Sequence, residues 1–93
     1  MLTFEWDDGK AKANIRKHGV AFEEGTSVFG DIMSLTISDS EHSAIEEDRF
    51  ITIGLSIRGR ILVVVHCDRD DNIRIFSVRT ATRRERGIYE KSY

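Results

Sequence analysis

The 93-residue sequence contains no proline and only one cysteine, Cys67. A single cysteine excludes an internal disulfide and a zinc site built from several cysteines, and it fits a reducing compartment. Proline interrupts helices and sheet ladders, so its absence suits regular elements joined by short turns. No apolar run approaches membrane-spanning length, and no basic start precedes an apolar stretch. We therefore expect a cytoplasmic protein with no membrane segment.

The sequence also has little net charge, but its value of −2 hides an asymmetry. Residues 1–48 contain four Lys/Arg and eleven Asp/Glu, whereas residues 49–93 contain ten and five. A basic half can present a positive face to phosphates or to an acidic partner. The alternative is an ordinary charged surface, and composition does not decide between the two. The length predicts one domain, residues 1–93.

Hydrophobic periodicity and turn residues predict the element order β-α-α-β-β-β-β-α. The expected elements are an extended entry at 4–6, helices at about 8–18 and 22–29, strands at about 35–37, 49–56, 61–65 and 73–79, and a short helix opening at Thr82. Residues 38–48 are polar and acidic and predict a loop. We expect an α+β fold: a twisted antiparallel sheet, a meander in its second half, with two N-terminal helices and one short C-terminal helix.

Local signals support the predicted helix ends. Asp7 is placed to cap the first helix, and Gly19 is a natural C-terminal stop. Thr82 with Glu85 three residues later has the pattern of a capping box. These residues predict where the first and last helices begin or end.

Three arginines lie on the strands of the predicted meander: Arg49, Arg74 and Arg79. RNA, the substrate that a family resemblance of this sequence implies, can be cut without a metal if a base activates the 2′-OH, cations neutralise the phosphorane and an acid protonates the leaving oxygen. The planar guanidinium grips phosphate with two hydrogen bonds, which suits these arginines to that work. The alternative is that they pair with carboxylates on the same sheet.

Strand periodicity separates two of these arginines. With a period of two, Arg79 shares a face with Ile75, whereas Arg74 lies on the other face. Both reach one phosphate only if a bulge or the twist of the sheet brings them together. Arg79 ends its strand near the basic start of the last helix, so we expect it to neutralise the phosphorane, with Arg49 or Arg74 positioning the RNA backbone.

The sequence has three histidines. His66 follows the apolar run 61–65, and the ordinary histidine pKa of about 6.5 suits proton transfer, so we expect it to carry the proton. A partly buried histidine is an equally good interpretation. His18 ends the first helix, where its default role is to cap the helix and its alternative role is catalysis. Together with Lys17 it is also expected to contact RNA. His42 has no assigned role, and the spacing predicts no metal site and no cofactor.

The last predicted helix begins with unusual charges. Arg83, Arg84 and Arg86 lie in its first turns, where each positive charge costs roughly 0.3–1 kcal/mol. Phosphate, a partner protein or the acidic half of the chain could compensate. We expect Arg83 and Arg84 to bind RNA. Tyr89 could stack on a base, although packing against the sheet is the commoner role.

An ordered series of motifs resembles the BrnT toxin family over nearly the whole chain. In the first half the series is Phe4-Glu5-Trp6-Asp7, Lys10, Asn14, Lys17-His18-Gly19-Val20, Phe22-Glu23, Val28-Phe29 and Asp31. In the second half it is Asp48-Arg49-Phe50, Ile53-Gly54, Leu62-Val63-Val64-Val65-His66, Ile73-Arg74-Ile75, Ser77-Val78-Arg79, Ala81-Thr82-Arg83-Arg84-Glu85-Arg86 and Tyr89. Each motif alone is weak, but the ordered series is specific.

The resemblance implies a RelE-like fold and a toxin of a type II toxin–antitoxin system that cleaves RNA and inhibits translation and growth. It also implies a BrnA-like ribbon-helix-helix antitoxin, expected in a heterotetramer, which masks the toxin and binds operator DNA. The acidic net charge favours an alternative, an inactive homologue that serves as an antitoxin-binding co-repressor. A DNA-binding domain is a weaker third hypothesis, because the basic residues follow strands rather than a recognition helix.

Overall fold

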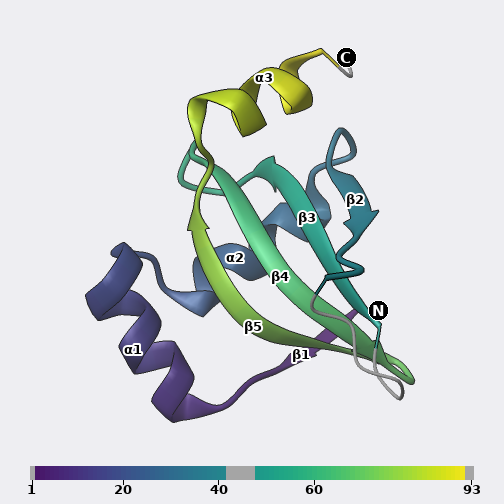
Figure 1. Cartoon of the computed structure of the whole chain (residues 1–93). Coiled ribbons are helices and arrows are strands. Elements are labelled where there is room, and N and C mark those ends of the chain that lie inside the picture. Colours follow the sequence, from purple (N-terminus) through teal and green to yellow (C-terminus); the bar gives the residue numbers. More distant parts are fainter. Residues whose placement is uncertain (1, 42–47, 92–93) are drawn as a thin grey trace.

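The computed structural model describes residues 2–41 and 48–91. The described residues form nine elements, whose arrangement can be followed in Figure 1. They are β1 (Thr3–Glu5), α1 (Asp8–His18), α2 (Phe22–Thr26), the 3₁₀ helix η1 (Ser27–Gly30), β2 (Leu35–Ser38), β3 (Arg49–Leu55), β4 (Ile61–Arg69), β5 (Asn72–Thr80) and α3 (Arg83–Glu90). Residues 42–47 of the predicted acidic loop, including His42, lie outside the described residues.

The strands form one five-stranded sheet in the order β1-β5-β4-β3-β2. Strands β2 to β5 pair antiparallel, which confirms the predicted meander. β1, however, runs parallel to β5 and pairs Glu5 with Arg74. The expectation of a wholly antiparallel sheet is therefore wrong, and the sheet is mixed. A parallel pair needs a long connection, here most of the chain, so no local turn signal predicts it.

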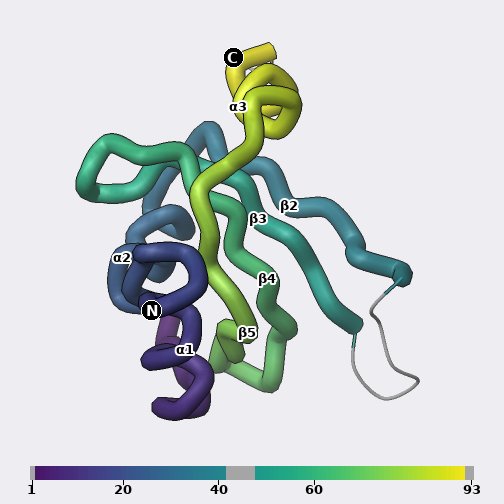
Figure 2. Tube along the Cα trace, turned by 60° about the vertical axis from the view of Figure 1, so that its left-hand side comes forward, coloured from purple at the N-terminus to yellow at the C-terminus, as the bar shows by residue number. Residues whose placement is uncertain are grey.

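One face of the sheet is covered by α1, α2 and η1, which Figure 2 shows on one side of the strands. The core on this face joins Val20, Phe22 and Val28 to Leu62, Val64, Ile73, Ile75 and Val78. Gly25 lets α2 approach β5, because a Cβ at this position would lie 2.6 Å from Cγ2 of Val78. The predicted single helix at 22–29 is instead α2 followed by η1.

Asn14 fastens α1 to the edge of β5. Its buried amide donates to the carbonyls of Val20 (2.9 Å) and Val78 (2.7 Å) and accepts from the N–H of Val78 (3.2 Å). β1 pairs with β5 only from Asn72 to Arg74, so Asn14 completes the edge beyond the end of β1. Burying these backbone groups is favourable because every one of them has a partner.

The other side of the sheet, opposite α1, α2 and η1, is called the open face below. Of the described helices only α3 lies on this side, over one end of the strands (Figure 1). Tyr89 of α3 packs there with Ile53 and Val63. The predicted capping box is confirmed, with the Thr82 and Glu85 side chains each bonding the other's backbone N–H. Across the described ranges 2–41 and 48–91, no helix is long and apolar enough to cross a bilayer.

Candidate functional site

Arg49 and Arg74 lie on the open face on either side of Cys67. The sheet register pairs Arg49 of β3 with Cys67 of β4, and Cys67 with Arg74 of β5. Residues directly opposite each other in paired antiparallel strands project to the same face. Three adjacent strands therefore carry these two arginines in one row across the sheet.

A β-bulge brings Arg79 to the same face. On β4, Val65 pairs with Ser77 and His66 pairs with Ile75, so Phe76 is the extra residue on β5. Beyond the bulge, Arg79 pairs with Val63, which lies four residues from Cys67 along β4. Strict alternation along β5 therefore gave the wrong face for Arg79. The bulge, which the sequence analysis allowed as a possibility, places all three arginines on the open face.

Arg74 and Arg79 are each paired with a carboxylate. Nη1 of Arg74 donates to Glu5 of β1 at 2.8 Å. Nη1 and Nη2 of Arg79 donate to the two carboxylate oxygens of Glu85, at 2.7 and 2.8 Å. This bidentate bond is the main reason why the pKa of Glu85 falls to about 2, and it raises the pKa of Arg79. The alternative interpretation of paired arginines thus applies to Arg74 and Arg79.

The bulge residue Phe76 is surrounded by cations. The guanidinium carbon of Arg49 lies 4.0 Å from the centroid of the Phe76 ring. Nζ of Lys10, on α1, lies 5.4 Å from the same centroid. Both distances fall within the range of cation–π attraction. The Phe76 ring, Arg49 and Lys10 therefore lie together on the part of the open face that is nearest to α1.

His66 lies on the covered face, away from the three arginines. It is 3% exposed, its Nε2 lies 2.7 Å from Oγ1 of Thr52, and its ring contacts Phe29 and Phe50 at centroid distances of 4.9 and 5.9 Å. Burial lowers the pKa of His66, partly opposed by Asp68. The predicted proton carrier therefore does not reach the open face. The other interpretation, a buried histidine, describes it better, with Thr52 as its partner.

Tyr89 is also buried, at 2% exposure. Its hydroxyl donates to Oδ2 of Asp31 at 2.6 Å, and the same carboxylate accepts from the backbone N–H groups of Met33 and Leu55. These bonds hold α3 to the chain between η1 and β2. Packing, rather than stacking on a base, is the role that this position supports.

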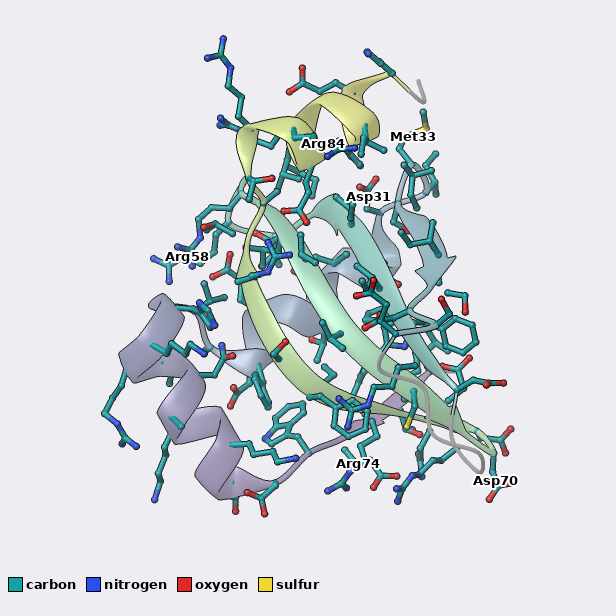
Figure 3. The ribbon with its side chains drawn as sticks, viewed as in Figure 1. Asp31, Met33, Arg58, Asp70, Arg74 and Arg84 are labelled. Atoms are coloured by element: carbon teal, nitrogen blue, oxygen red, sulfur yellow. The ribbon has the colours of Figure 1, made fainter. Side chains whose placement is uncertain are left out.

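The remaining predicted RNA contacts lie at the periphery. Lys17 and His18 end α1, and Arg83 and Arg84 are exposed in the first turn of α3. Figure 3 shows Arg84 at one end of the molecule and Arg74 toward the other. The structure therefore brings Arg49, Arg74 and Arg79 to one face, while Lys17 and His18 lie on α1 and Arg83 and Arg84 lie on α3.

Sequence reasoning missed a buried ion pair on the far side of the molecule. Glu24 of α2 accepts from Nε of Arg60 at 3.0 Å and from Oγ of Ser56 at 2.7 Å. The bond from Arg60 is the main cause that lowers the pKa of Glu24. Its partners lie 32 and 36 residues away, so no local pattern predicts the pair. It ties the β3–β4 turn to α2.

The described residues bring together no group of three or more His, Cys, Asp or Glu side chains that could hold a metal. What the open face offers is positive charge from guanidinium groups, held in place by carboxylates and an aromatic ring. Guanidinium groups in this setting suit the binding of phosphate oxygens. The arrangement can therefore bind a polyanion and stabilise negative charge on it.

Comparison with known proteins identifies the family. The family model described as "Ribonuclease toxin, BrnT, of type II toxin-antitoxin system" matches residues 6–85. The crystal structure of the Brucella abortus ribonuclease toxin BrnT is similar, with a TM-score of 0.65, 21% identity, and coverage of 89% of this chain and 99% of that one. A comparison with curated proteins gives no match.

The structural likeness supports the α+β fold, while the RelE-like classification stays a prediction. Because the family model spans most of the sequence, the chain belongs to the BrnT family of ribonuclease toxins of type II toxin–antitoxin systems.

Proposed function

We propose that this chain cleaves RNA without a metal ion and that the open face carries the reaction. The observation that carries the proposal is the common face of Arg49, Arg74 and Arg79, which the bulge at Phe76 produces. Preorganised cations aimed at a developing phosphorane are usually the largest single contribution to this chemistry. The family places the chain among ribonuclease toxins, and the charge on the open face supports the proposal that RNA binds there.

In the proposed reaction the RNA 2′-OH attacks the adjacent phosphate, and Arg79 neutralises the phosphorane. To do so, Arg79 must exchange its bond to Glu85 for a bond to phosphate. Arg49 and Arg74 position the backbone. Glu5 lies beside Arg74, so we propose that its carboxylate, rather than buried His66, takes the proton of the 2′-OH. The P–O5′ bond then breaks and the protonated carboxyl returns this proton to the leaving 5′-oxygen, which gives a 2′,3′-cyclic phosphate and a 5′-hydroxyl. Flanking RNA would meet the peripheral cations Lys17, His18, Arg83 and Arg84.

A second function has its own supporting observation. Arg74 and Arg79 are already neutralised by Glu5 and Glu85, so less positive charge is available for RNA than the sequence suggests. A catalytically weak chain could still bind an antitoxin and act as a co-repressor at their promoter. This is the alternative to an active ribonuclease.

The proposed partner is a BrnA-like antitoxin of the ribbon-helix-helix type. We expect one antitoxin dimer to bind two toxins and to cover the exposed arginines at the start of α3, with operator DNA contacted only through the antitoxin. Removing the antitoxin would then inhibit translation and growth. Static light scattering of the chain with the product of its neighbouring gene should give the mass of a heterotetramer. No association would contradict this partner.

The test of the ribonuclease proposal is expression of the chain alone, followed by assays of the purified protein. Growth arrest with loss of RNA is expected in cells. In vitro, cleavage should persist in EDTA and leave a 2′,3′-cyclic phosphate or a 3′-phosphate. A strict Mg²⁺ requirement with 3′-hydroxyl products would contradict metal independence. Tight antitoxin binding and repression without any cleavage would favour the co-repressor.

A further inference from the structure

Phe76 is an aromatic residue of the open face that the proposed reaction does not use. Phe76 is half-buried, and it is the extra residue of the bulge on β5. A bulge re-aims side chains and commonly accompanies a functional site. Here it turns a large apolar ring toward the same face as Arg49, whose guanidinium carbon lies 4.0 Å from the ring centroid.

The neighbours of Phe76 are those of a nucleobase platform. Single-stranded RNA is recognised by stacking its bases on aromatic rings or on guanidinium planes, while nearby cations bind the backbone. Phe76 supplies the ring, Arg49 supplies a guanidinium group against it, and the exposed Lys10 places its ammonium 5.4 Å from the centroid. These three side chains come from α1, β3 and β5 and meet only in the folded protein.

The place of Phe76 relative to the other arginines fits this role. It lies between Arg74 and Arg79 along β5, the two arginines that flank the bulge on the open face. A base held at Phe76 would keep its own phosphates close to the guanidinium groups on either side. A second aromatic group, Phe50, shares β3 with Arg49, but it packs against His66 on the covered face.

We propose that Phe76, with Arg49 and Lys10, forms a stacking subsite for one nucleobase of a single-stranded RNA substrate. This inference rests on the proposed ribonuclease function and deepens it. A stacked base fixes the register of the strand, so the subsite acts in substrate binding and not in the chemical step.

The matched variants are Phe76→Leu and Phe50→Leu. Both replace phenylalanine by leucine within the sheet, but only the first removes a ring from the open face. The first measurement is the affinity for a 2′-O-methyl oligonucleotide, which the proposed reaction cannot cut because it lacks a free 2′-OH. We expect Phe76→Leu to weaken binding about tenfold, or about 1.4 kcal/mol. Phe50→Leu, checked by thermal melting, should bind like the wild type, and Phe76→Trp should retain binding.

An abasic residue scanned along the oligonucleotide provides a second test. At one position, removing the base should weaken binding to the wild type by a similar factor and have no effect on Phe76→Leu. With cleavable RNA, Phe76→Leu should raise KM and leave kcat nearly unchanged. A folded Phe76→Leu that binds every oligonucleotide like the wild type, or a wild type that does not bind them, would overturn the subsite. Because binding is scored on uncut RNA, a wild type that binds but does not cleave contradicts the proposed function alone.

Discussion

The two faces of the sheet are built from the same strands but carry different polar groups. On the covered face, buried Asn14 bonds to Val78 at 2.7 Å and buried His66 to Thr52 at 2.7 Å, while Glu24 of α2 pairs with Arg60 of the β3–β4 turn. On the open face, Arg74 and Arg79 are charged and are held by carboxylates. The covered face therefore contributes mainly to the stability of the fold, whereas the open face gathers positive charge that can bind a phosphate.

Phe76, the extra residue of the bulge, determines the face of the sheet on which Arg79 lies. Without the bulge, β5 would alternate regularly, and Arg79 would point toward α1 and α2 instead of sharing a face with Arg74. One extra residue thus changes a strand of ordinary periodicity into one that carries both arginines on one side. If this division is correct, Asn14 on the covered face should affect stability, whereas removing an arginine from the open face should slow RNA cleavage.

The largest effect on stability is expected from Asn14→Ala. The substitution leaves the N–H and carbonyl of Val78 and the carbonyl of Val20 without their partner, at a cost of about 3 kcal/mol. For a domain of this size the melting temperature should fall on the order of 15 °C. Lys12→Ala, an exposed position on the same helix, is the matched control and should melt close to the wild type. Equal melting temperatures of the two variants would show that the bonds of Asn14 do not stabilise the fold.

A smaller effect, dependent on pH, is expected from Glu85→Gln. The pKa of Glu85 is lowered from 4.5 to about 2, chiefly by its bond to Arg79. The pairing therefore stabilises the fold above pH 4.5, and the stabilisation is lost as the pH falls from 4.5 through about 2. At neutral pH, the free energy of unfolding of Glu85→Gln should be about 2 kcal/mol lower than that of the wild type. This value is already reduced because the ion pair is partly exposed to solvent.

Denaturant melts of the wild type and Glu85→Gln between pH 2 and 7 measure this difference. Glutamine can still accept from the Thr82 N–H, so the capping box is preserved and the comparison isolates the ion pair. The two curves should converge toward pH 2. A constant gap across this range would show that the charge of Glu85 is not responsible.

The smallest effect is expected from Tyr89→Phe. The variant loses the hydrogen bond from the Tyr89 hydroxyl to Asp31, whose carboxylate keeps the backbone N–H groups of Met33 and Leu55 as donors. A loss of about 1 kcal/mol in the free energy of unfolding should follow, with unchanged RNA cleavage. If cleavage is lost while the melting curve is preserved, Tyr89 contacts RNA after all, and α3 belongs to the site.

The sequence predicted the features that depend on neighbours along the chain. Gly19 ends α1 in the left-handed conformation, and Thr82 with Glu85 caps α3. The meander follows from short turns between apolar strands. β4, however, extends from Ile61 to Arg69, beyond the predicted end at Val65. Its last residues pair with β3 and β5 but are less apolar than the run 61–65, so hydrophobicity alone did not predict them.

The features that the sequence did not predict depend on distant contacts. The parallel pairing of β1 joins residues at opposite ends of the chain, and the bond between Glu24 and Arg60 crosses 36 positions. The burial of His66 follows from the rings of Phe29 and Phe50, which no period reveals. For the candidate site, residue types were predictable, but the common face of the arginines was not.

The most direct test of the central claim is the single-turnover rate of RNA cleavage by Arg79→Ala, compared with Arg83→Ala. Because removing Arg79 leaves Glu85 without its partner, the double variant Arg79→Ala/Glu85→Gln is measured as well, and thermal melting confirms folding. The account predicts about a hundredfold loss of rate, roughly 3 kcal/mol, in both Arg79 variants. Arg83→Ala should cleave nearly as fast as the wild type. Folded Arg79 variants that cleave at the wild-type rate would contradict the account. Loss of cleavage in Arg83→Ala alone would contradict it as well and would place the reaction on α3.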